Sequence, residues 1–379
     1  MKKLDLNLND FHNYIKDKKI LCFGAGKHGR RMLDIMHNYE KLNDLVGFID
    51  NNPEKWGETF EYEGFSIPIF SIEDAFENYD EDVIIVITCL DYIKIAKQLE
   101  DFEANIKEKE RKKERTYISL VEVGLNQLAY SDYPAVIKQY DEPVIPKKIH
   151  YCWFGKGEKS DLLKQNIEKW KKLCPDYEII EWNEENYDVT KNEYMKQAYE
   201  KKIWGFVPDY ARLDIIYNHG GIYLDTDVDM IKRPDDFLYQ DCFATFEGTL
   251  MMNLGAGFGA RPGCEIIKEL RDYYDNVSFI KPDGTIDDTA CMMHSYAVLK
   301  KYNYKLNDTL QTVKDMNIYP MIFQGTCSYL CLMRVTEKTH FCHYGSNTWL
   351  KQNIHDIKTE ISKQFKISEN SGFIKYNVK

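Results

Sequence analysis

Two acidic residues, Asp225 and Asp227, follow a short apolar segment and are separated by one residue. In an extended chain, residues two apart lie on the same face, so we expect the two carboxylates to point the same way. Carboxylate oxygens are the ligands that hard divalent cations prefer. The spacing therefore predicts a cation site. Asp229 lies one step further along the same face and is either an extra ligand or a solvated acid.

The elements before the acidic pair are expected to position it. A helix is predicted over residues 208–219, because Pro208 suits the first helical turn and apolar residues recur at helical spacing. Gly220 and Gly221 end the helix, and residues 222–224 form a short buried strand by composition. This strand delivers the acidic pair to its end.

Composition limits the class of protein. The chain has 379 residues, of which 44% are hydrophobic and 29% charged, as in a globular protein with room for two domains. A net charge of −11 argues against nonspecific nucleic-acid binding. We expect no signal peptide and no membrane span, because no apolar run approaches about 20 residues. Ten cysteines without a Cys-x-x-Cys pair favour reduced thiols, so a cytoplasmic protein is predicted.

Residues 1–102 are predicted to form a small, Rossmann-like parallel α/β domain. A buried strand runs into a Gly-x-Gly-x-x-Gly turn, then a helix, and then a second strand that ends in an acidic residue. Such glycines let backbone amides approach a phosphate, and the acid can take ribose hydroxyls. The same glycines also allow tight helix–sheet packing without a ligand, so a docking or regulatory module is the alternative. The residues of this candidate nucleotide site are Gly24, Gly26, Gly29 and Asp50.

The rest of the chain is predicted to hold a connector and a second domain. Mixed charges dominate residues 107–115, so residues 103–142 are expected to form a charged helical connector. In residues 143–379, strand-like and helical segments alternate, which predicts an α/β sheet with binding groups at the carboxyl ends of its strands. Trp153 and the acidic pair both follow such strands.

Three motifs in order make the second domain resemble a family 32 glycosyltransferase. This family carries the DxD sugar-binding region and includes capsular and surface-polysaccharide transferases; the large clostridial glucosylating toxins are more distantly similar. The resemblance covers about 200 residues and implies a GT-A fold, a nucleotide-sugar donor with UDP preferred, and Mn²⁺ or Mg²⁺ as the metal. The matching segments are 145–153, 207–229 and 339–349.

The resemblance also implies roles for the metal-binding and catalytic residues. Asp227 would bind the metal directly, and Asp225 would bridge the metal and the ribose. His343 lies where relatives place a residue that contacts the metal or a phosphate; a structural core histidine is the alternative. Arg212 would contact the sugar or phosphate close to the reacting bond.

The same resemblance implies a set of donor-binding residues. Trp153 would stack on the base, Asp209 would contact donor hydroxyls together with Arg212, and Tyr223 would lie beside the sugar or diphosphate. Taken alone, Asp209 and Arg212 are better explained by a surface ion pair three residues apart, and Trp153 by core packing. Beside the acidic cluster, the surface ion pair is the weaker explanation. Ser346, Thr348 and Trp349 would close over the diphosphate, although relatives usually have Ser-Trp where this chain has Thr-Trp.

Other interpretations remain at this point. An EF-hand loop fits poorly, because Met230 takes the glycine position and a strand precedes the acids. A phosphotransferase with an aspartyl nucleophile also places Asp-x-Asp after a strand. Asp287 and Asp288 are explained as helix-capping residues, with acceptor binding as the alternative. The glycine-rich turn alone would also suit an oxidoreductase.

The sequence thus predicts a metal-dependent glycosyltransferase of capsular or surface-polysaccharide biosynthesis. The acceptor would be a saccharide or a lipid-linked saccharide, and the latter would bring the protein to the inner face of the membrane. The resemblance implies retention of anomeric configuration, and no carboxylate stands out as an inverting base. The alternative is a nucleotide-sensing regulatory protein with a non-catalytic transferase-like domain. The donor sugar, linkage and oligomeric state are not set by the sequence.

Overall fold

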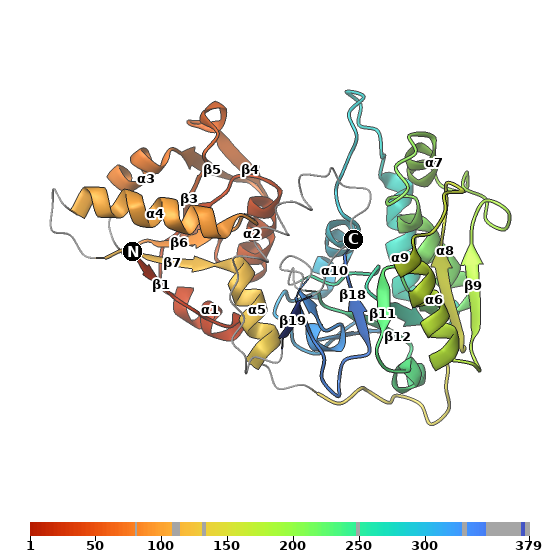
Figure 1. Cartoon of the computed structure of the whole chain (residues 1–379). Helices are drawn as coiled ribbons and strands as arrows, with labels where there is room; N and C mark the ends of the chain where they lie inside the picture. Colours follow the sequence, from red (N-terminus) through yellow and green to blue (C-terminus); the bar gives the residue numbers. More distant parts are fainter. Residues whose placement is uncertain are drawn as a thin grey trace. The chain divides into compact units, whose positions relative to one another are not determined.

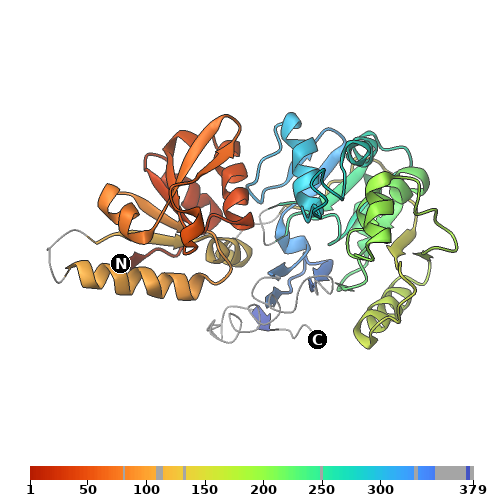
Figure 2. The same cartoon turned by 90° about the horizontal axis from the view of Figure 1, so that it is seen from above.

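The computed structural model describes residues 1–79, 82–107, 114–130, 134–247, 251–327, 332–345 and 373–375. These residues divide into two compact units, the first ending at residue 130 and the second beginning at residue 134 (Figures 1 and 2). In the described part of the chain, no helix is long and apolar enough to cross a membrane.

The first unit is built on a seven-stranded sheet with the order β1-β7-β6-β2-β3-β5-β4. All neighbouring strands are parallel except β4 and β5. Every residue of the central strands β2 and β6 is buried, as expected of strands covered on both faces. Figure 1 shows α3 and α4 on one side of this sheet and α1 and α5 on the other. The strands are β1 (Lys2–Lys3), β2 (Ile20–Phe23), β3 (Leu45–Ile49), β4 (Thr59–Tyr62), β5 (Phe65–Phe70), β6 (Ile84–Ile87) and β7 (Thr116–Ser119), and the helices are α1 (Leu8–Ile15), α2 (Lys27–Asn38), α3 (Ile72–Asn78), α4 (Tyr92–Lys107) and α5 (Leu120–Tyr130).

The segment expected to be a helical connector belongs largely to this first unit. A boundary at residue 102 would cut α4, and residues 116–119 form strand β7 instead of a helix. The mixed charges of residues 107–115 favoured a solvated helix, so this short strand was not predicted. Its residues Tyr117 and Ile118 are buried. The guanidinium of Arg115 lies 4.2 Å from the ring of Phe76 and donates to the backbone carbonyl of Phe76. This charged side chain therefore makes contacts inside the first unit. Most of the charged run, residues 108–113, lies outside the described residues.

The second unit has a mixed seven-stranded sheet with the order β14-β15-β12-β13-β10-β8-β9. β8, β9 and β10 are parallel to one another, and β13 runs antiparallel between β10 and β12. The predicted α/β class is therefore confirmed in both units. The strands are β8 (Lys148–Cys152), β9 (Glu178–Trp182), β10 (Gly221–Tyr223), β12 (Cys242–Thr245), β13 (Phe258–Ala260), β14 (Gln311–Val313) and β15 (Met316–Tyr319), and the helices are α6 (Asp161–Leu173), α7 (Glu193–Glu200), α8 (Pro208–His219), α9 (Glu265–Tyr273) and α10 (Cys291–Leu299).

Two small sheets complete the second unit. β11 (Val228–Met230) lies beside β18 (Phe341–His343) in Figure 1 and pairs with it antiparallel. Val228 is the partner of His343. This pairing brings the acidic segment beside a strand more than a hundred residues later in the chain. β17 (Leu332–Arg334) lies between β16 (Thr326–Cys327) and β19 (Phe373–Lys375) in the other sheet.

Candidate active site

Helix α8 carries Asp209 and Arg212 into the interior of the second unit. Their side chains are 5% and 4% exposed, and Arg212 Nη2 lies 3.1 Å from Asp209 Oδ1. The pair is thus buried, and the alternative of an exposed surface pair is wrong. Pro208 occupies the first turn of α8, as predicted, and Arg212 Nε donates to its carbonyl at 3.1 Å.

The two glycines after α8 turn the chain into β10. Both have positive φ, +59° at Gly220 and +105° at Gly221, where L side chains are strained. A Cβ on Gly221 would also lie 2.8 Å from the carbonyl oxygen of Lys148. The chain therefore turns sharply enough for β10 to pair with β8, and their carboxyl ends lie at the same edge of the sheet.

Asp225 and Asp227 do not lie in an extended segment as the sequence suggested. β10 ends at Tyr223, and a turn follows in which Val228 N donates to Asp225 O at 3.0 Å. The two carboxylates converge because the chain turns, not because residues alternate along a strand. The two carboxylates converge in both descriptions, and a cation site at this position stays a prediction.

Asp225 is held from several directions. Its carboxylate accepts from the Tyr223 hydroxyl at 3.0 Å and lies 3.6 Å from Arg212. Its amide donates to Gly255 O at 3.1 Å, and a Cβ on Gly255 would lie 2.2 Å from Asp225 Oδ2. Only glycine leaves room for this carboxylate beside Arg212.

His343 faces the acidic turn from β18. Its Nε2 lies 3.3 Å from Asp227 Oδ1, and its Nδ1 lies 3.3 Å from Glu247 Oε1. Ligand atoms of Asp225, Asp227 and His343 all lie within 4.8 Å of one another. Two carboxylates and one imidazole form a donor set that suits Mn²⁺, and Mg²⁺ through the carboxylates, so the residues fit the metal that the resemblance implies.

The electrostatics of the site follow from this crowding. Burial raises the pKa of Asp209 to about 7, and the charge of Asp225 adds to this, while Arg212 opposes it. Burial and the nearby charge of Asp227 likewise raise the pKa of Asp225. Burial lowers the pKa of His343, but the charges of Asp227 and Glu247 outweigh it and hold that pKa well above its usual value. A divalent cation would relieve the repulsion among these carboxylates.

The site opens into a cavity of about 300 Å³. Six of the predicted site residues line it: Trp153, Asp209, Arg212, Asp225, Asp227 and His343. Trp153 comes from the end of β8, and its indole Nε1 donates to Gly157 O at 2.7 Å. The cavity thus joins an aromatic side chain at one strand end to acids at the neighbouring strand end.

Some predicted residues lie elsewhere. Tyr223 is fully buried and is not among the residues that line the cavity; it contacts Asp225 from behind. Asp229 pairs with Lys169 at 2.5 Å and accepts from Tyr344 at 3.1 Å, so these contacts hold it outside the ligand set. Ser346, Thr348 and Trp349 lie outside the described residues.

Asp287 makes the local contacts of a turn. Its carboxylate accepts from the amide and hydroxyl of Thr289, at 3.2 and 2.6 Å. The helix-capping role expected of Asp287 and Asp288 is wrong, because α10 begins at Cys291, its N-cap residue is Ala290, and no side chain caps it. Neither Asp287 nor Asp288 is among the residues that line the cavity.

Several other residues of the site lie outside the three matching segments of the sequence. Trp204 and Phe206 line the cavity just before α8, and Trp204 is 36% exposed. Their nearness to Asp209 in sequence was a usable signal. Asn253 and Cys291 reach the same cavity from distant segments, and Glu247 contacts His343 from a segment that carries no motif.

Helix α6 holds the acidic turn and β11 along one face. Asn166 donates to Thr226 O at 3.0 Å, and Trp170 Nε1 donates to Val228 O at 3.0 Å. At the end of the helix, Arg233 donates to Leu173 O at 2.9 Å. These contacts follow one another at helical spacing, so α6 acts as a rigid support for the turn that carries Asp227.

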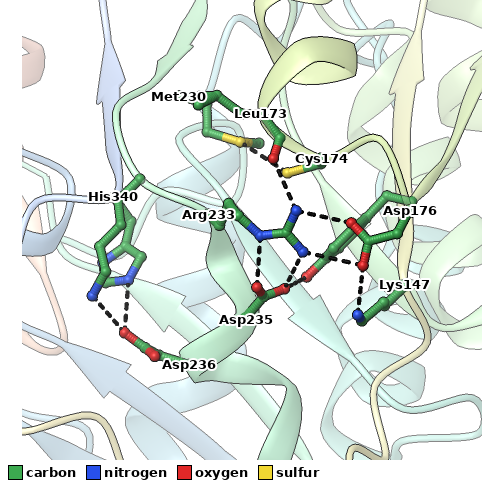
Figure 3. Close-up of polar contacts among 11 residues, drawn as sticks. Lys147, Leu173, Cys174, Asp176, Met230, Arg233, Asp235, Asp236 and His340 are labelled. Carbon is green, nitrogen blue, oxygen red and sulfur yellow. Dashed lines mark hydrogen bonds and ion pairs between the residues drawn. The ribbon is translucent and has the colours of Figure 1, made fainter.

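Arg233 is itself fixed by carboxylates on two sides. It lies 2.8 Å from Asp176 and 2.7 Å from Asp235, and Lys147 also contacts Asp176 at 2.6 Å (Figure 3). His340 Nε2 lies 3.4 Å from Asp236 Oδ2, and the close-up shows the two side chains next to each other. This polar cluster secures the segment that leaves β11 and gives no sign of a ligand site.

In the first unit, side chains from a neighbouring segment contact the backbone of the glycine-rich turn. Gly24 has φ +111°, and a Cβ on Gly29 would lie 2.2 Å from Gly24 O, so these two glycines serve the turn and close helix packing. Asp50 accepts from Ala25 N at 2.8 Å and from Lys55 Nζ at 2.9 Å. These contacts give the turn a structural function. A nucleotide at Gly24, Gly26, Gly29 and Asp50 stays a prediction.

Comparison with known proteins agrees with the geometry of the second unit. Residues 160–244 match the family described as glycosyltransferase sugar-binding region containing DXD motif, and this segment includes α6, α8 and the acidic pair. Residues 16–110 match a family described as C2185-like, N-terminal. No curated protein shows a significant match to the chain.

Two of the solved structures that match the chain illustrate a weak likeness. PaToxG glycosyltransferase is 17% identical, with 48% of this chain and 78% of that chain covered and a TM-score of 0.33. A glycosyltransferase involved in the glycosylation of the major capsid of PBCV-1 is 10% identical, with 56% and 98% covered and a TM-score of 0.30. At these TM-scores neither likeness bears on the site. The DXD match itself confirms the prediction of a glycosyltransferase, with its sugar-binding region in the second unit.

Proposed function

We propose that this glycosyltransferase is metal-dependent and moves a sugar from a nucleotide-sugar donor to a saccharide acceptor. One observation carries the proposal: ligand atoms of Asp225, Asp227 and His343 lie within 4.8 Å in the wall of a cavity that also contains a buried arginine. A site with this donor set beside a cationic side chain suits a diphosphate.

Asp227 and His343 would hold the cation, with Asp225 as the third ligand. A bound Mn²⁺ or Mg²⁺ would neutralise the negative charge of the nucleoside-diphosphate leaving group. Arg212 adds a fixed positive charge beside the same position. Burial and its contacts with Asp209 and Asp225 hold that charge in place, so it needs no reorganisation when negative charge develops.

The cavity also offers surfaces for the rest of the donor. The indole of Trp153 is a platform for a nucleobase, since aromatic faces stack on any base. Asp209 lines the cavity and presents an acceptor for donor hydroxyls. The preference for UDP comes from the family resemblance alone. Ser346, Thr348 and Trp349 would contact the diphosphate.

The carboxylates of the cavity wall support a retaining reaction. Asp209 and Asp225 are engaged with Arg212, and Asp227 faces His343, so each is already committed to a partner. We therefore propose attack by the acceptor hydroxyl on the face of the sugar that the leaving phosphate occupies. The acceptor would be a saccharide or lipid-linked saccharide of surface-polysaccharide assembly, and the reaction would take place in the cytoplasm.

The test measures release of nucleoside diphosphate from a panel of nucleotide sugars, with and without Mn²⁺. Wild-type protein should hydrolyse or transfer at least one donor only with metal. Asp227→Ala should lose this activity by at least about 100-fold, whereas Asp161→Asn, an exposed acid on α6, should not. Full metal-dependent activity in Asp227→Ala would show that the site is wrongly assigned.

A further inference from the structure

Glu247 is a buried acid behind the candidate metal site. It follows β12 and is 3% exposed. Its Oε1 lies 3.3 Å from His343 Nδ1, and its Oε2 accepts a short hydrogen bond from Asn253 Nδ2. Both partners line the cavity, so this carboxylate connects two walls of the site from the inside.

The backbone around Glu247 fixes the position of its carboxylate. Phe246 and Met252 form a β-bridge, and Glu247 N donates to Met251 O at 2.9 Å. Asn253 N donates to Thr245 O at 3.2 Å, which extends the same pairing. A buried carboxylate costs free energy unless it is hydrogen-bonded, and here Asn253 and His343 supply two of its contacts.

The two nitrogens of His343 face different partners. Nε2 faces Asp227 at 3.3 Å, whereas Nδ1 faces Glu247. A histidine that ligates a metal through one nitrogen commonly donates its other N–H to a carboxylate, which fixes the tautomer and the ring orientation. A cation bound at Nε2 would displace the proton of that nitrogen; the proton left on Nδ1 is then directed at Glu247 and the lone pair of Nε2 at the acidic turn.

We propose that Glu247 is a positioning residue for the cation: it orients His343 and holds the tautomer that presents Nε2 to the metal, while Asn253 holds the Glu247 carboxylate. The inference deepens the proposed function and rests on it. Glu247 lies about a hundred positions from His343 and about twenty from Asp227 in the sequence. The pairing of β11 with β18 and the β-bridge after β12 bring the three residues together.

Titration of the full chain with Mn²⁺, followed by electron paramagnetic resonance of the free ion, tests this directly. Glu247→Gln keeps the size of the side chain and an acceptor for one partner, and should weaken Mn²⁺ binding roughly 10- to 100-fold. In a His343→Ala background, the same substitution should change the affinity by less than about twofold, because the residue on which Glu247 acts is gone.

The outcomes separate the two proposals. Equal losses from Glu247→Gln in both backgrounds would mean that Glu247 acts through its charge or through the fold and not through His343, and would overturn the positioning role. Unchanged Mn²⁺ affinity in Glu247→Gln would also overturn it while leaving the metal site intact. Wild-type protein that binds no Mn²⁺ would overturn the proposed metal dependence itself.

A second measurement tests the tautomer of His343 without a variant of Glu247. It replaces the titration if Glu247→Gln does not fold or if His343→Ala binds Mn²⁺ too weakly for the comparison. Wild-type protein with ¹⁵N-labelled histidine, loaded with diamagnetic Zn²⁺, should show His343 protonated at Nδ1 and ligating through Nε2. The His343 signal is assigned by its loss in His343→Gln. Ligation through Nδ1, or no ligation, would overturn the inference.

Discussion

Arg212 Nη2 lies 3.1 Å from Asp209 Oδ1 and 3.6 Å from Asp225 Oδ1, so a single buried guanidinium joins the helix α8 acid to the first acid of the turn. Its centre also lies 5.1 Å from the ring of Tyr223. The charge that would meet a diphosphate is therefore fixed by three neighbours before any ligand binds.

Replacement of Arg212 by lysine should reduce donor turnover by about 100- to 1,000-fold, as for loss of one fixed electrostatic contact. An ammonium keeps the charge but cannot reach Asp209 and Asp225 in the same geometry, because it lacks the planar fork of donors. Steady-state release of nucleoside diphosphate measures the effect. Arg271→Lys, on α9 beside Asp272, is the matched control and should keep its activity. Equal losses in the two variants would contradict the role of Arg212.

The sequence predicts the parts of the site that depend on local order. The helix, glycine pair and strand before Asp225 come from residues within a short segment, and all three lie where expected. The convergence of Trp153 with the acidic pair could also be predicted, since both follow parallel strands and such strands end at one edge of a sheet.

The sequence alone does not predict the contacts that depend on distant pairing. Glu247 meets His343 only because β11 pairs with β18 and a β-bridge follows β12. Neither segment shows a pattern that selects the other. We predicted the convergence of Asp225 and Asp227 from the alternation of side chains along an extended strand. That local geometry was wrong, because a turn begins at Asp225. β7 was missed because a four-residue strand behind a charged run carries too little pattern.

Substitution of Asn166 by alanine should loosen the turn that carries Asp227. The variant loses the hydrogen bond to Thr226 O, which corresponds to about 1 kcal/mol of unfolding free energy. We expect Mn²⁺ affinity to fall severalfold as well, since the carbonyl lies between the two acids. Urea unfolding and Mn²⁺ titration check the two effects. Lys171→Ala, exposed on the same helix, should change neither. A loss of stability without any loss of Mn²⁺ affinity would show that α6 supports the fold but not the cation site.

Stability at low pH should depend on Glu269, which lies on α9. Burial raises the pKa of this group, but contacts from Lys301, Lys314 and Tyr302 outweigh burial and lower the pKa from 4.5 to about 2. A carboxyl whose pKa is depressed on folding stabilises the protein fully above its unfolded pKa and loses that contribution as pH falls through the folded pKa. Wild-type protein should therefore be more stable than Glu269→Gln at pH 7, and the difference should shrink between pH 4.5 and 2. Urea unfolding across this range measures it, and Glu265→Gln, an exposed acid on the same helix, is the control. A difference that stays constant with pH would mean that packing, and not the charge of Glu269, carries the stabilisation.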